Sequence, residues 1–494
     1  MFFLPQLRAS AASRLFPASG AILLMCLAVN AGPAGPVTLS PQLLTLPAGN
    51  SGLLFVDIDG DGRSDLLVID PMERKLLNYH QRPDGFSNSP DQSIPLPPQT
   101  AWVAPCDVDA HPGLELLFST AAGLVYSRQN AGLFESERHT LIDANQVFSN
   151  FDFPILTRLD TNNAGTNVSI PVITAEQAVL YRRDNTYQWS PGPPLALDAK
   201  ETRWHTNLDS WWDSQWTLGP NPGQSLRVRQ VLLPKSDAKG NEEAETETIR
   251  KISDDLKKKA NAGPPRTVRM DVNGDGREDL VLWQVSGKMD TKTEIYVFLR
   301  GTDQKLPEHP TQILHCRGFP IPTGSTSQIS PVIDLNGDGI CELVLLELKS
   351  SITSVSGAVE TALSHGLDWS LTVRSFHNGA FSRSPEASVV VTGLLSAEAS
   401  REWPIFILGD FNGDGRPDLF FRRSETLWNV YFSTTDGSWF SPQPAMNFET
   451  PDQGYIEIKD LNGDGLSDII WHEPDERRLS IFMSPPRQTK GKNP

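Results

Sequence analysis

Five short segments of the chain carry oxygen-bearing side chains at one shared spacing. Each has Asp at position 1, Asp or Asn at position 3, Asp at position 5 and Asp or Glu at position 9, with Gly at positions 4 and 6. These side chains are Asp57, Asp59, Asp61 and Asp65; Asp271, Asn273, Asp275 and Asp279; Asp334, Asn336, Asp338 and Glu342; Asp410, Asn412, Asp414 and Asp418; and Asp460, Asn462, Asp464 and Asp468. Closely spaced oxygen ligands suit a hard cation, and calcium accepts their flexible geometry better than magnesium. The pattern predicts about five calcium sites.

The residues that follow these loops distinguish them from the EF-hand, the helical calcium-binding motif. That motif needs a bidentate Glu at position 12 and a helix, whereas position 12 here holds apolar residues such as Val68 and Leu282. Each fourth acid is followed at once by a β-type apolar run, for example Leu66 to Ile69. The loops therefore join strands. Glycine at position 6 permits the sharp turn that frees the position 7 carbonyl to bind the ion.

Two weaker copies extend the series to seven loops, which begin at residues 57, 107, 160, 271, 334, 410 and 460. The copy at Asp107 keeps Asp109 and Glu115 but has His111 at position 5, and metal binding there is left open. The copy at Asp160 lacks the oxygens at positions 5 and 9. A third strand and an aromatic-Ser turn follow most loops. Radial repetition of such units predicts an all-β, seven-bladed β-propeller of four-stranded antiparallel blades.

The two ends of the chain predict how the propeller closes. After the Asp460 loop only two strands remain before a Pro-rich tail, so the last unit lacks its fourth strand. The stretch from Leu44 to Pro47 lies 13 residues before Asp57, as Ile94 to Pro97 lies 13 before Asp107. The first strand is therefore expected to complete the last blade, which protects a sheet edge.

An insertion at residues 198–264 interrupts the period. It opens with Trp204, Trp211, Trp212 and Trp216, which either pack the insertion onto the propeller or form a platform for a ligand. Its second half predicts one helix, with a thin apolar stripe that includes Leu256. An eighth blade without a metal loop is the alternative, because Leu226 to Leu233 has strand character.

The loops and aromatic-Ser turns resemble the FG-GAP repeat, also called VCBS, known from the propeller of integrin α-subunits. The resemblance runs from about Val37 to Met483. It implies calcium binding through the side chains named above and through the backbone carbonyls of Arg63, Arg277, Ile340, Arg416 and Leu466. It also implies a scaffold or adhesion role without catalysis.

The net charge of the chain and its N-terminal segment indicate which partners and which location to expect. A formal charge of −17 over 494 residues argues against a nucleic-acid partner. Residues 1–31 have the basic, apolar and small-residue regions of an export signal, so residues 32–494 are expected to form the propeller in a secreted, periplasmic or cell-surface protein without a membrane span.

A binding module for a protein or glycan is the favoured function. A polysaccharide lyase or hydrolase on the same scaffold is the alternative, although the chain has no His-Glu-x-x-His helix and no Gly-x-Ser-x-Gly elbow. The chain is therefore not expected to be an enzyme.

Overall fold

The computed structural model describes most of the chain after residue 35. The described residues are 36–48, 52–146, 155–156, 169–173, 177–192, 194–196, 204–205, 217–218, 226–227, 250–252, 254–256, 262–287, 291–323, 328–348, 367–393, 405–435, 438–451, 454–473 and 477–486. The predicted export signal, the Asp160 loop and the side chains of Trp204, Trp211, Trp212 and Trp216 lie outside them. No helix within them is long and apolar enough to cross a membrane.

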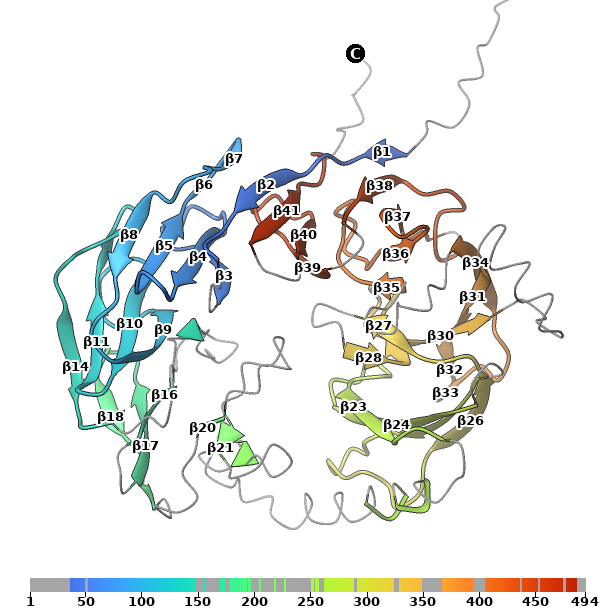
Figure 1. The fold of residues 1–494 in the computed structure, drawn as a ribbon. Coiled ribbons are helices and arrows are strands. Elements are labelled where there is room, and N and C mark those ends of the chain that lie inside the picture. The colour runs from blue at the N-terminus through green and yellow to red at the C-terminus, as the bar shows by residue number, and fades with distance from the viewer. Residues whose placement is uncertain are drawn as a thin grey trace, which may run out of the picture. The chain divides into compact units, whose positions relative to one another are not determined.

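The fold is all-β and is built from four-stranded antiparallel sheets, numbered 1 to 7 in chain order (Figure 1). Sheet 1 contains β3 (Leu53–Val56), β4 (Asp65–Asp70), β5 (Lys75–Tyr79) and β8 (Gln92–Pro95). Sheet 2 contains β9 (Thr100–Cys106), β10 (Glu115–Thr120), β11 (Gly123–Ser127) and β14 (His139–Asp143). Sheet 3 contains β16 (Ser169–Ile173), β17 (Gln177–Arg183), β18 (Trp189–Pro191) and β19 (Leu195–Ala196).

The second half of the chain repeats this plan. Sheet 4 contains β23 (Arg266–Met270), β24 (Asp279–Ser286), β25 (Lys292–Phe298) and β26 (Gln312–Arg317). Sheet 5 contains β29 (Val332–Ile333), β30 (Glu342–Leu348), β31 (Leu367–Arg374) and β34 (Ala387–Gly393). Sheet 6 contains β35 (Ile405–Ile407), β36 (Leu419–Arg422), β37 (Leu427–Tyr431) and β38 (Met446–Glu449). Sheet 7 contains β39 (Tyr455–Lys459), β40 (Asp468–His472) and β41 (Arg478–Phe482).

The N-terminal strand completes sheet 7, as the sequence predicts. Strand β2 (Gln42–Thr45) pairs antiparallel with β41, with Leu44 opposite Leu479 (Figure 1). The side chain of Leu44 is 1% exposed, whereas its neighbour Leu43 is 57% exposed. The alternation of the strand therefore places one leucine in the core and the other in solvent.

Two sheets are larger than the predicted four strands. Strand β15 (Ile155–Leu156) pairs in parallel with β9 and extends sheet 2 to five strands. Sheet 6 gains β1 (Val37–Thr38) beside β38, and β27 (Ile321–Thr323) with β28 (Gln328–Ser330) beside β35. These edge strands come from connecting segments, and pairing them satisfies backbone groups that an open edge would expose.

Short hairpins and the insertion make up the remaining elements. The hairpins pair β6 (Gln81–Arg82) with β7 (Gly85–Phe86), β12 (Gln129–Asn130) with β13 (Leu133–Phe134), and β32 (Phe376–His377) with β33 (Ala380–Phe381). The insertion contributes a small sheet of β20 (Trp204–His205), β21 (Thr217–Leu218) and β22 (Leu226–Arg227). Residues 250–252 and 254–256 are helical, and Leu256 is 2% exposed, so this part of the predicted helix docks as expected.

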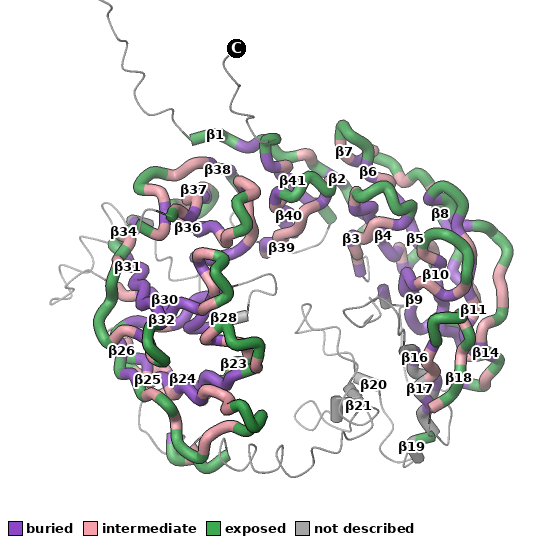
Figure 2. The backbone as a smooth tube through the Cα atoms, turned by 180° about the vertical axis from the view of Figure 1, so that it is seen from behind, coloured by how far each residue is buried: buried purple, intermediate pink, exposed green. Residues whose placement is uncertain are grey.

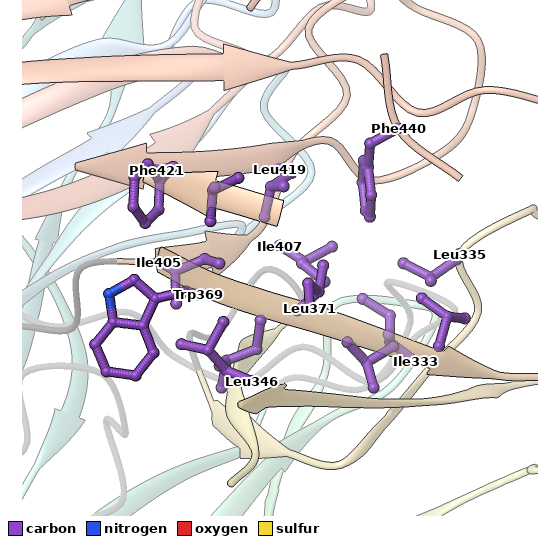
Figure 3. Packing of buried hydrophobic residues seen from close by; sticks show 14 residues of the cluster. Ile333, Leu335, Leu346, Trp369, Leu371, Ile405, Ile407, Leu419, Phe421 and Phe440 are labelled. Atoms are coloured by element: carbon purple, nitrogen blue, oxygen red, sulfur yellow. The ribbon is translucent and has the colours of Figure 1, made fainter. Parts of the chain in front are cut away.

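The second strand of the sheets is largely buried, as in β4, β10, β24, β30 and β40 (Figure 2). Each core cluster is shared by two sheets. One of them joins Leu371 and Leu346 of sheet 5 to Ile407 and Phe421 of sheet 6 (Figure 3). Other clusters join sheets 1 and 2, 2 and 3, 4 and 5, 6 and 7, and 7 and 1. Packing of adjacent sheets therefore supplies the apolar burial that a single sheet lacks.

Candidate metal centres

The five acidic loops share one conformation, and the first strand of their sheet leads into each. They are Asp57–Asp65, Asp271–Asp279, Asp334–Glu342, Asp410–Asp418 and Asp460–Asp468, named below by their first residue. Both glycines of each loop have positive φ, between 71° and 86°. A side chain would be strained at such angles, which explains glycine at position 4 as well as position 6.

The side chain at position 1 organises each turn. Its Oδ1 accepts the amide of the position 4 glycine at 2.5–2.8 Å, and its Oδ2 accepts the amide of the position 6 glycine at 2.6–2.9 Å. Position 3 accepts the amide of position 5 at 2.8–3.1 Å, and position 5 accepts the amide of position 7 at 2.8–3.0 Å. The three acceptor side chains are thereby fixed around one turn of backbone.

The Asp57 loop has acids at positions 1, 3 and 5, whereas the other four loops have Asn at position 3. Asp57, Asp59 and Asp61 each place a carboxylate oxygen within 4.8 Å of the other two. Burial is the largest cause that raises the pKa of Asp59, and the charges of Asp65 and Asp61 add to it. Carboxylates this close repel one another, and a divalent cation bound between them would remove the repulsion. The donor set therefore fits a hard ion such as calcium.

The position 9 acids have a structural role that the spacing alone does not reveal. They are Asp65, Asp279, Glu342, Asp418 and Asp468, and each is at most 3% exposed. One oxygen accepts the position 2 amide at 2.8–3.2 Å. In four loops the other oxygen accepts an amide just after the third strand, at Gln81, Arg300, Ser433 or Ser484. The acid therefore ties its loop to the strands of the same sheet.

Burial makes these position 9 carboxylates costly to ionise. It raises the pKa of Glu342 and of Asp418 to about 7 and that of Asp468 to about 6, although backbone hydrogen bonds oppose the rise. Acidic neighbours at positions 1 and 5 raise these pKa values further. A cation in the loop would offset both causes by stabilising the charged forms.

The resemblance implies a role for the position 7 backbone carbonyl but none for the arginine side chain that three of the loops have there. The structure instead places three arginine side chains on the position 5 carboxylates, pairing Arg63 with Asp61, Arg277 with Asp275, and Arg416 with Asp414. Asp61 and Asp275 each accept one guanidinium and one amide, and Asp414 also accepts Asn412 Nδ2 at 3.0 Å. A carboxylate has about four acceptor positions, so each of them leaves room for an ion. The residues of these loops thus remain compatible with calcium.

The weaker Asp107 loop differs because arginines from outside the loop pair with its acids at positions 1 and 3. The Nη1 atom of Arg183, on β17 of the next sheet, lies 2.8 Å from Asp107 Oδ2, and Arg183 is 4% exposed. Asp109 accepts hydrogen bonds from Arg128 Nε at 2.8 Å and from Tyr126 Oη at 2.9 Å. Burial opposes a fall in the pKa of Asp109, but the bonds from His111, Arg128 and Tyr126 lower it overall.

Glu115, at position 9 of this loop, is fully buried. Its Oε2 accepts the Val108 amide at 2.7 Å, while its Oε1 has no hydrogen-bond partner. Burial raises the pKa of Glu115 to about 7. The sequence identifies Glu115 as a loop acid, but it does not identify Arg128 and Arg183 as the partners of Asp109 and Asp107, because both arginines lie outside the loop.

The family comparison matches the C-terminal part of this series. The FG-GAP-like repeat family matches residues 410–471, which run from the Asp410 loop through β40. The chain contains an FG-GAP-like repeat. The chain has no match among curated proteins.

Two solved structures are among those similar to this chain. The Tc holotoxin pore of Photorhabdus luminescens is 12% identical over 87% of this chain and 16% of the toxin chain, with a TM-score of 0.27. A lectin of Agrocybe aegerita that recognises non-reducing terminal N-acetylglucosamine is 11% identical over 86% of this chain and 75% of the lectin, with a TM-score of 0.23. The chain thus spans about a sixth of the toxin chain.

Proposed function

We propose that this chain is an exported, calcium-stabilised β-propeller that acts as a binding module for a protein or glycan and carries out no catalysis. The observation that carries the proposal is the common conformation of the five acidic loops. Each presents carboxylate or amide oxygens at positions 1, 3 and 5 around one turn, above a buried acid at position 9. Calcium would contribute positive charge where these acids are closest.

The series of sheet contacts supports the propeller. Core clusters join six successive pairs of sheets, among them sheet 7 and sheet 1 from opposite ends of the chain. A seven-bladed ring needs one more contact, between sheets 3 and 4, which lie on either side of the insertion. Strand β2 joins the two termini within sheet 7, as ring closure requires.

The loop chemistry supports binding over catalysis. The acids that the fold brings together accept hydrogen bonds from their own loop backbones, which fixes them in place. We propose that calcium keeps the sheets rigid, and that the segments connecting them present the recognition surface.

The test uses the full secreted chain. It is applied to a glycan array and to a pull-down of extracellular proteins, in about 1 mM calcium and in EDTA. The proposal predicts retention of a partner in calcium, weaker retention in EDTA and no change in glycan length. Release of shortened glycans would identify an enzyme instead, and partner retention that is indifferent to EDTA would contradict the role of calcium.

A further inference from the structure

The five acidic loops touch one another in a fixed order. The order is Asp271, Asp334, Asp410, Asp460 and then Asp57, so the last step joins the C-terminal and N-terminal parts of the chain. At three of the four junctions a position 8 amide donates a hydrogen bond to a carbonyl of the preceding loop. Cys341 donates to Val272 at 2.9 Å, Ser467 to Asp410 at 2.7 Å, and Ser64 to Leu461 at 2.6 Å.

The glycines at position 4 bring the same loops close together. A Cβ atom at Gly463 would lie 2.3 Å from the carbonyl oxygen of Gly62, and one at Gly274 would lie 3.1 Å from that of Gly339. At the remaining junction, a Cβ at Gly337 would lie 3.6 Å from the carbonyl oxygen of Gly415. Pro417 holds position 8 there and has no amide to donate. Three of the four junctions therefore contain a backbone hydrogen bond, and the fourth brings Gly337 close to Gly415.

The series ends at the Asp57 loop. A Cβ at Gly60 would meet no atom within 4 Å, so its position 4 glycine does not pack against a further loop. The next loop in the chain begins at Asp107, and there Arg183 and Arg128 already pair with the acids. The connected series therefore ends before the Asp107 loop, in which arginines from outside the loop pair with the acids at positions 1 and 3.

We infer that these loops bind calcium as one coupled series, in which an ion in one loop raises the affinity of the loops that touch it. The inference rests on the proposed calcium binding. The junction bonds join residues that lie next to the expected ligands. The donor at position 8 directly follows the position 7 carbonyl, and the acceptor carbonyl belongs to position 1 or 2, at the start of the neighbouring loop. An ion that orders one loop also fixes the backbone groups that this loop contributes to its junctions. The neighbouring loop therefore loses less conformational entropy when it binds its own ion.

Charge works in the opposite direction, because each bound ion lowers the negative potential that attracts the next. That effect is screened over about 8 Å at 0.15 M salt. The junction contacts act at hydrogen-bond distance and are not screened in this way. Measurements at physiological ionic strength therefore separate the two effects.

Ser467→Pro tests the coupling without changing a side-chain ligand. It removes the position 8 amide and also the hydroxyl that accepts the Asp410 amide at 2.9 Å. The Asp410 loop already has Pro417 at position 8, so the loop conformation accepts proline. Glu278→Pro is the matched control, since Glu278 holds position 8 of the first loop in the series, is exposed, and has no preceding acidic loop in the series.

Hydrogen exchange of the peptide spanning residues 410–418 is followed against free calcium at 0.15 M salt. We expect the half-protecting calcium concentration to rise about fivefold or more in Ser467→Pro. It should stay unchanged in Glu278→Pro. Equal concentrations in wild type and Ser467→Pro would overturn the coupling and leave the calcium sites in place. Protection of no loop by calcium would overturn both.

A second variant guards against misfolding of Ser467→Pro. Asp464→Asn weakens calcium binding in the Asp460 loop, and it leaves intact the Asp460 bonds to the Gly463 and Gly465 amides that hold the turn. The coupling predicts that the Asp410 and Asp57 loops, which touch the Asp460 loop, then need more calcium for protection. The calcium concentration that protects the Asp271 loop should stay unchanged, because that loop touches only the Asp334 loop. If calcium protects the four remaining loops at wild-type concentrations, the sites are independent.

Discussion

The titration of Glu115 can be measured separately from the proposed calcium binding of the five acidic loops, because Glu115 belongs to the Asp107 loop. Its carboxyl is buried in a loop whose other acids pair with arginines, and burial raises its pKa to about 7. The unfolded chain has a carboxyl pKa near the ordinary 4.5. Between these values the folded state binds more protons than the unfolded state, so the free energy of unfolding falls as the pH rises.

Glu115→Gln should therefore remove a pH-dependent loss of stability. Relative to the variant, wild type is expected to lose about 1 to 3 kcal/mol of unfolding free energy between pH 4.5 and pH 8. Urea denaturation of both proteins in EDTA measures the difference. A difference that stays constant with pH would show that Glu115 ionises normally.

Arg183 should stabilise the chain whether or not calcium is present. Arg183→Gln removes the partner of Asp107 and a guanidinium that packs over the ring of Tyr187 at 4.6 Å. We expect a loss of about 1 to 3 kcal/mol, equal in calcium and in EDTA, because the arginine supplies the positive charge of this loop. Arg182→Gln, one residue earlier on β17, is the control. Rescue of the Arg183 variant by calcium would mean that the loop binds the ion.

At the scale of elements, a glutamine clasp joins neighbouring sheets and recurs three times. Gln92 on β8 donates to the carbonyl of Phe134 at 2.6 Å and accepts the Phe134 amide at 2.8 Å. Gln42 makes the same pair of bonds with Phe86, and Gln312 makes it with Phe381. In two of the three clasps the Phe belongs to an aromatic-Ser turn, Phe86-Ser87 or Phe381-Ser382. In all three the Gln lies on the outer strand of the preceding sheet and bonds the Phe backbone.

Gln92→Ala should cost about 1 to 3 kcal/mol, because it leaves both backbone groups of Phe134 without these partners. Ser93→Ala on the same strand is the control, since Ser93 is exposed. Chemical denaturation of the two variants gives the comparison. Equal stabilities would show that water replaces the clasp without cost.

The sequence predicts those elements that follow from local pattern. The five loops, the strands after them and the third strands, such as β5 and β37, lie where composition and spacing place them. The parallel pairing of β15 with β9, and of β27 with β35, was not predictable, because short segments show no register of their own. The glutamine clasps were not predictable either, since Gln312 and its partner Phe381 are 69 residues apart in the sequence.

For the whole molecule, the pairing of β2 with β41 ties the two ends of the chain together. Leu44 lies in a core cluster shared by sheets 7 and 1. Leu44→Ala should therefore destabilise the fold by about 2 to 5 kcal/mol through lost burial and a cavity. Leu43→Ala, at the exposed neighbouring position, should change stability by less than about 0.5 kcal/mol. Similar effects of the two substitutions would mean that β2 does not complete the sheet in solution.

The negative net charge of the chain makes calcium binding important for the stability of the whole molecule. The chain carries −17, and its five acidic loops gather acids that repel one another without an ion. Calcium that binds the folded state alone adds about 1.4 kcal/mol per site at ten times the dissociation constant. Several such sites together compare with the stability of a typical domain.

The most direct test of calcium stabilisation is the unfolding temperature of the full chain as free calcium is raised from EDTA to about 1 mM. Calcium stabilisation predicts a rise of at least about 5 °C that continues with calcium concentration, as expected of an ion bound only by the folded state. An unfolding temperature that is the same in EDTA and in calcium would contradict it.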